Sequence, residues 1–305
     1  VNLLPIADAG ADQTICNQES AILNATGGTL FEWNTGETTA SITVNPTTTT
    51  TYSVTVSDAN GCSAEDNVVV NVNPLPVADA GIDQTICNGF DATLTASGGI
   101  SYQWSTGEVT DAITVAPTTT TNYQVTVTAV NGCTALDDVT VNVNTLPTAD
   151  AGPDQSICLG FAATFNATGG VDYLWSTTET TPGITVVPII TTTYSVTVTD
   201  ASGCSSTDAV TVTVNPLPVA DAGTDQTICN QDSATLTATG GSTYEWSTTE
   251  TTATITVTPS TTTTYTVTVT DVNGCTDDTS VVVNVNPLPV ADAGTDQTIC
   301  IGFDA

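Results

Sequence analysis

Apolar and polar residues alternate along this chain with a period of two, in short runs separated by glycine, asparagine and proline. Such alternation is typical of strands with one buried face, and no stretch has the period of a helix. Over positions 1–74 the pattern predicts strands at 13–16, 20–26, 30–34, 41–45, 51–57 and 66–73. The positions expected to face inward in these strands are Ala21, Leu23, Ala25, Phe31, Trp33, Ile42, Val44, Tyr52, Val54, Val56, Val68, Val70 and Val72.

The whole pattern recurs along the chain at one fixed interval. The motif ADAG marks that interval, because it begins at Ala7, Ala78, Ala149, Ala220 and Ala291. Self-similarity at a fixed period predicts one structural unit per copy. We therefore predict immunoglobulin-like domains over 1–74, 75–145, 146–216 and 217–287, and the start of a fifth over 288–305.

Each copy carries one tryptophan and one tyrosine at fixed places in the strand pattern. We expect these eight residues in the cores: Trp33, Trp104, Trp175, Trp246, Tyr52, Tyr123, Tyr194 and Tyr265. About six short strands with a buried tryptophan on the third predict an all-β, immunoglobulin-like sandwich. Linkers such as 73–76 contain two prolines, which restrict bending, so the tandem array is expected to form a rod.

The charge composition excludes several classes of function. The chain has no Lys, Arg or His, against 32 Asp and Glu. Without cations it has no means to bind nucleic acid or anionic lipid, and without His or Lys most acid–base and Schiff-base catalysis is ruled out. No apolar run reaches the length of about 18 residues that a membrane span needs. We therefore predict a protein that is not an enzyme and does not insert into a membrane in this segment. We also predict that it is a segment of a longer chain, because no Met occurs and the last copy is interrupted.

Several motifs together resemble a known group of repeats. These are ADAGADQTIC, the tryptophan motif YQWSTGE and the turn YSVTVSDANGC. They are similar to the PKD-like and immunoglobulin-like repeats of the very large, SprB-type surface adhesins of gliding Bacteroidota. Ala129 stands where the other copies have Asp, and Thr178 and Thr249 replace Gly36. The resemblance implies an adhesive or moving surface fibre that is exported by type IX secretion and located outside the cell, at its surface.

Two cysteines per repeat, without C-x-x-C and without His, predict disulfides rather than a metal site. If strands alternate in immunoglobulin order, Cys16 and Cys62 lie at opposite ends of their domain, too far apart to bond. The favoured pairs then cross the junctions: Cys16 with Cys133, Cys87 with Cys204, and Cys158 with Cys275. Cys62, Cys229 and Cys300 are left without a partner in these residues. The alternative, Cys16 with Cys62, holds if residues 35–40 do not return the chain between the third and fourth strands.

Other candidate sites are weaker. Asp8, Asp12 and Asp58 are candidate calcium ligands near a junction; calcium is the one cofactor considered. Ser233, in Asp-Ser-Ala, resembles a short O-glycosylation motif of Bacteroidota and also fits the start of a strand. Two functions remain open: a structural stalk or filament segment that projects an adhesive region and transmits force, or an array of modules that bind polysaccharide or calcium by avidity. The expected partners are neighbouring repeats, with lateral self-association or a polysaccharide as further candidates.

Overall fold

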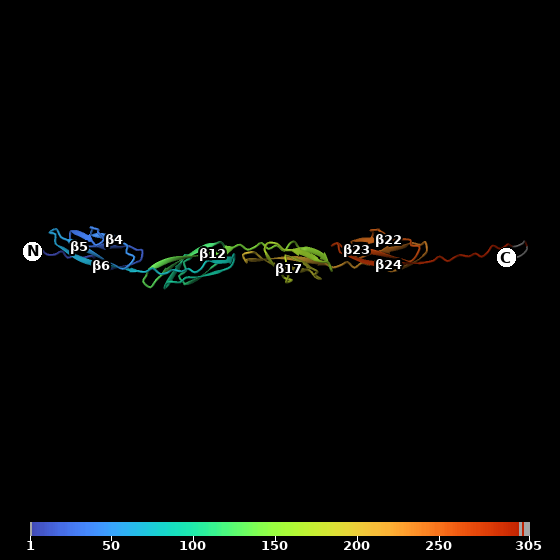
Figure 1. The fold of residues 1–305 in the computed structure, drawn as a ribbon. Helices are drawn as coiled ribbons and strands as arrows, with labels where there is room; N and C mark the ends of the chain where they lie inside the picture. The colour runs from blue at the N-terminus through green and yellow to red at the C-terminus, as the bar shows by residue number, and fades with distance from the viewer. Residues whose placement is uncertain (1, 299–300, 302–305) are drawn as a thin grey trace. The chain divides into compact units, whose positions relative to one another are not determined.

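The computed structural model describes residues 2–298 and 301. The regular elements in this part are all β-strands, in agreement with the period-two alternation (Figure 1). No helix long and apolar enough to cross a membrane occurs among these residues. The chain falls into two units, Val1–Leu146 and Pro147–Ala305, and each contains two of the predicted repeats.

In the first unit, each repeat contributes six strands. The strands of the first repeat are β1 (Gln13–Cys16), β2 (Ala21–Asn24), β3 (Leu30–Trp33), β4 (Ser41–Val44), β5 (Thr50–Ser57) and β6 (Ser63–Asn73). Those of the second are β7 (Gln84–Cys87), β8 (Ala92–Thr95), β9 (Ser101–Trp104), β10 (Ala112–Val115), β11 (Thr121–Thr128) and β12 (Thr134–Asn144).

The second unit repeats the same set of strands. The strands of the third repeat are β13 (Gln155–Cys158), β14 (Ala163–Asn166), β15 (Asp172–Trp175), β16 (Gly183–Val186), β17 (Thr192–Thr199) and β18 (Ser205–Asn215). Those of the fourth are β19 (Gln226–Cys229), β20 (Ala234–Thr237), β21 (Thr243–Trp246), β22 (Thr254–Val257), β23 (Thr263–Thr270) and β24 (Thr276–Asn286).

Each repeat is a sandwich of a two-stranded and a four-stranded sheet. In the first repeat β2 pairs antiparallel with β4, and the other sheet has the order β1-β6-β5-β3. Within the larger sheet β1 runs parallel to β6, whereas β5 is antiparallel to both β6 and β3. This division of strands between two sheets, with the first strand beside the last, is the immunoglobulin-like arrangement that the sequence predicted.

The chain does return between the third and fourth strands. β1, β3 and β6 share one direction, and the antiparallel bridge between Asp8 and Thr26 gives β2 the opposite one. Because β4 is antiparallel to β2, it runs in the same direction as β3. Residues 34–40 therefore carry the chain back along the sandwich, so the alternation of strand direction is complete.

Each repeat encloses its own hydrophobic core between the two sheets. The four tryptophans are at most 2% exposed, and the four tyrosines on the fifth strands at most 9%. The indole Nε1 of Trp33 donates a hydrogen bond to the carbonyl oxygen of Thr39 (3.0 Å), which fastens the returning segment over the core. Val72 is less buried than the other residues expected to face inward on β6: it is half-buried near the end of the strand, opposite Ile15 of β1.

Candidate functional site

The parallel pairing of first and last strands fixes where the cysteines of one repeat lie. Cys16 ends β1 and is directly opposite Asn73 at the end of β6. Cys62 precedes the first residue of β6, which is eleven residues long. At the rise of an extended strand this places the two cysteines about 35 Å apart, whereas Cα atoms joined by a disulfide are less than about 7 Å apart. Cys16 therefore does not bond Cys62.

Cys16 instead forms a disulfide with Cys133 of the second repeat. The S–S bond is 2.04 Å long and the Cα atoms are 5.6 Å apart. Cys133 lies in the turn that precedes β12 and is fully buried. In the same turn, the side-chain amide of Asn131 donates to the carbonyl oxygen of Pro74 in the linker (3.1 Å). A covalent bond and a hydrogen bond thus fasten the start of the second repeat to the end of the first.

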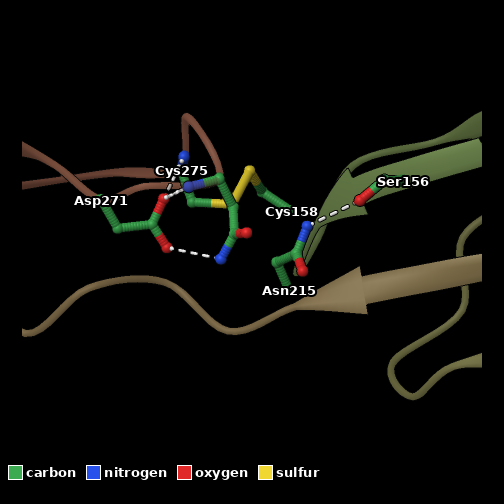
Figure 2. Close-up of a disulfide and its surroundings, with 6 residues drawn as sticks. Ser156, Cys158, Asn215, Asp271 and Cys275 are labelled. Carbon is green, nitrogen blue, oxygen red and sulfur yellow. Dashed lines mark hydrogen bonds between the residues drawn. A yellow bond between two sulfur atoms is a disulfide. The ribbon is translucent and has the colours of Figure 1, made fainter.

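The second unit contains the equivalent bridge. Cys158 at the end of β13 bonds Cys275, which precedes β24, with Cα atoms 5.5 Å apart (Figure 2). Beside it, the amide of Asn215 donates to the hydroxyl oxygen of Ser156 (2.8 Å), which ties the ends of β18 and β13 together. We call the two bridges, Cys16–Cys133 and Cys158–Cys275, the staples.

A carboxylate holds the turn that presents the second cysteine. One oxygen of Asp271 accepts hydrogen bonds from the backbone N–H of Cys275 and of Asn273 (both 2.8 Å), as Figure 2 shows for the Cys275 turn. The Cys275 N–H contributes most to a lowered pKa of Asp271, and Cys62 acts likewise on Asp58. These aspartates form Asx turns, which fix the backbone conformation of the turn that ends at the cysteine.

The second repeat has Ala129 at the position of this aspartate and uses another acceptor. The side-chain oxygen of Asn131 accepts the hydrogen bond from the N–H of Cys133 (3.1 Å). The turn keeps its shape, because Gly132 has the positive φ that the other copies also show. The departure at Ala129 therefore does not disturb the staple.

The structure does not assemble the three candidate calcium ligands. Asp8 accepts the N–H of Gly10, and Asp12 accepts the N–H of Val69 (both 2.8 Å). Asp58 is engaged in the turn before β6. Within residues 2–298 and 301, no group of three or more His, Cys, Asp or Glu side chains lies close enough to hold a metal ion. The calcium hypothesis therefore gains no support from the geometry.

The sequence-predicted site residues that do not form the two staples include four cysteines and one serine, Cys62, Cys87, Cys229, Cys300 and Ser233. Cys62 is half-buried and Cys229 is exposed, and both are free thiols. Cys300 lies outside the described residues, and the pairing of Cys87 with Cys204 stays a prediction. Ser233 is exposed, immediately before β20.

Two groups of residues that fasten the segment before each first strand were not foreseen from the sequence. A carboxylate oxygen of Asp66 in β6 accepts the N–H of Ala9 (2.8 Å), which lowers the pKa of Asp66. Gly27 has φ +103°, and a Cβ atom there would lie 1.8 Å from the carbonyl oxygen of Ile6. The recurring Gly-Gly pairs were the available signal, because a position that permits so close a backbone approach requires glycine.

No model of a protein family matches the chain, and no protein of curated function matches it. Among solved structures, immunoglobulin domains 1–4 of Sidekick-1 are similar over 92% of this chain and 99% of theirs, with 12% identity and a TM-score of 0.27. The titin I-band fragment I67–I69 is similar over 70% of this chain and 100% of its own, with 11% identity and a TM-score of 0.34. A Ca²⁺-stabilized, ice-binding adhesin of an Antarctic bacterium matches over 94% and 100%, with 16% identity and a TM-score of 0.29. The assignment of fold rests on the strand order and pairing described above.

Proposed function

We propose that this chain is a stalk segment of a secreted surface adhesin: a non-enzymatic spacer whose repeats hold an adhesive region away from the cell and transmit force. The observation that carries the proposal is the position of the staples. Cys16–Cys133 and Cys158–Cys275 each join one repeat to the next, instead of closing a loop within one core. Such bonds reinforce connections between domains, which is the property that a load-bearing array requires.

The cysteine chemistry and the surface charge fit an extracellular location. Disulfides form and persist in oxidising compartments such as the bacterial cell exterior. A net charge of −32 without any Lys or Arg keeps repeats soluble and makes copies of the chain repel one another. The neighbouring repeats are therefore the proposed partners, and lateral association of chains would need salt to screen this repulsion.

Export by type IX secretion and a role in gliding are further parts of the proposal, and they rest on the resemblance of the repeat motifs alone. The rival function, an array of polysaccharide-binding modules, has no comparable support. A surface hollow of the first repeat is open and is lined by Leu30, Phe31, Glu32, Thr38, Thr55 and Ser57. Phe31 is the single aromatic residue that lines this hollow, and its ring is partly buried against the hydrophobic core of the repeat.

Small-angle X-ray scattering on the oxidised chain tests the spacer. The longest strand of each repeat has eleven residues, about 36 Å, so four repeats with their linkers in line would reach roughly 160 Å. A radius of gyration of about 19 Å, the value for one compact domain of this length, would refute the stalk. Co-sedimentation with insoluble polysaccharides such as cellulose and chitin tests the rival, and saturable binding would favour it.

A further inference from the structure

We propose that the staples turn selected strands into a continuous covalent strap that limits how far the chain can be stretched, even when its domains unfold. This inference rests on the proposed load-bearing function. It follows from where each bridge enters and leaves the strands.

The path of force through the first unit can be followed along the bonds. Tension applied before β1 passes along this strand to Cys16 at its end. The disulfide carries it to Cys133, which directly precedes β12. It then leaves along β12, which ends at Asn144. The segment between the two bonded cysteines, which includes β2 to β11, lies off this path.

The same path continues through the second unit. From Asn144 the backbone continues through residues 145–154 into β13, which ends at Cys158. The disulfide to Cys275 then passes the tension into β24. The strap therefore consists of first and last strands, linkers and disulfides, and it contains no hairpin that can be pulled open.

The limit on length follows from this connectivity. Between Cys16 and Cys275 the shortest covalent path consists of two disulfides and the backbone from Cys133 to Cys158, at most about 100 Å in all. The unbridged backbone between the same two cysteines would extend to roughly 900 Å. The staples thus reduce the maximum extension about nine-fold.

The strap also changes which bonds resist tension inside a repeat. Without a staple, force enters through β1 and leaves through β6, so the parallel hydrogen bonds between these strands carry it in shear. With a staple at Cys16, force leaves β1 through a covalent bond at the far end of the strand. Unfolding of the sandwich then neither lengthens the strap nor releases the load. If Cys87 bonds Cys204 as predicted, a second strap of the same design runs from Cys62 to Cys229.

Single-molecule force extension of the full 305-residue chain tests the strap, with handles joined enzymatically to the two ends so that the thiols remain untouched. The oxidised chain should reach a limit of about 70 residue steps plus two bridges, roughly 250 Å. After reduction with tris(2-carboxyethyl)phosphine the limit should rise about fourfold, to roughly 1,050 Å, with stepwise unfolding of the repeats.

Two variants sharpen the test. C16S/C133S removes one staple and should more than double the extension limit of the oxidised chain. The shortest covalent path between the two ends of the chain then includes backbone of the first repeats that the staple had bypassed. C62S changes a cysteine at the equivalent turn that is free and should leave the limit unchanged. An oxidised limit of roughly 400 Å would indicate bridges within repeats, and one equal to the reduced limit would indicate no bridges; either overturns the strap. Neither result depends on the scattering or polysaccharide measurements that test the stalk.

Discussion

Removing the first staple should destabilise the two repeats that it joins. In the variant C16S/C133S we expect each repeat to keep its fold, because Cys133 is buried in the turn at the junction and neither cysteine is a member of the four core clusters between the sheets. The magnitude follows from the loop that the bridge closes. If repeat 1 unfolds while repeat 2 stays folded, the chain from Cys16 to Pro74 forms a closed loop of about 58 residues. Loop-closure entropy for such a loop corresponds to about 4 kcal/mol, and for the 117-residue separation of the bridge to about 5 kcal/mol.

For a domain of this size, each 1 kcal/mol shifts the melting temperature by about 4–8 °C. We therefore expect the melting temperature of the stapled pair to fall by roughly 15–30 °C in the variant. Repeats 3 and 4 retain Cys158–Cys275 and should melt as before. Differential scanning calorimetry should show one broad transition for the parent chain and two separate transitions for the variant.

The control is C62S, which replaces the free, half-buried cysteine of the equivalent turn in repeat 1. Its melting profile should match that of the parent chain. If Cys87 is bonded to Cys204, repeat 2 keeps one bridge and the larger shift falls on repeat 1. A C16S/C133S variant that melts together with the parent chain would refute the loop-closure reasoning.

Three further predictions follow from the turns and the charge. Gly27→Ala should unfold repeat 1, because the added Cβ atom would collide with backbone atoms. Gly36 also has a positive φ but has open space around it, so Gly36→Ala should cost only the local backbone strain; circular dichroism melting compares the two variants. The free energy of unfolding should fall as the pH drops below about 3.8, because the Cys275 N–H lowers the pKa of Asp271 in the folded state. In acid titrations, the variant Asp271→Asn should lose less stability over this pH range than the parent chain does. Added NaCl should raise the melting temperature at pH 7, since it screens a charge of −32 and the side chains include no cation to form an ion pair; a fall would contradict this.

The third bridge of the series is also open to a direct test. Peptide mapping of the unreduced chain should yield a linked pair containing Cys87 and Cys204. Because the chain has no Lys or Arg, trypsin has no cleavage site, and cleavage at Asp and Glu is needed. A linked pair containing Cys87 and Cys133 would contradict both this prediction and the staple between Cys16 and Cys133.

The residue pattern was sufficient to predict the strands, the repeat and the composition of the cores. Apolar and polar residues alternate with a period of two in every copy, because each strand exposes one face to water and buries the other. This requirement is local and determines the residue type at every second position. The tryptophans on β3, β9, β15 and β21 could be assigned to cores for the same reason. Burial becomes less complete toward the end of β6, where Val72 is half-buried while Val68 and Val70 are fully buried.

The pairing of cysteines was decided by tertiary structure. The sequence left both Cys16–Cys62 and Cys16–Cys133 open, because the choice depends on whether a short segment returns the chain and on the register of two strands that are distant in the sequence. The returning segment, 34–40, and the parallel register of Cys16 with Asn73 place the two cysteines of one repeat at opposite ends. The carboxylates of Asp8, Asp12 and Asp58 looked like ligands in the sequence for a related reason: their partners are backbone N–H groups, which every residue except proline carries and which only folding brings within reach.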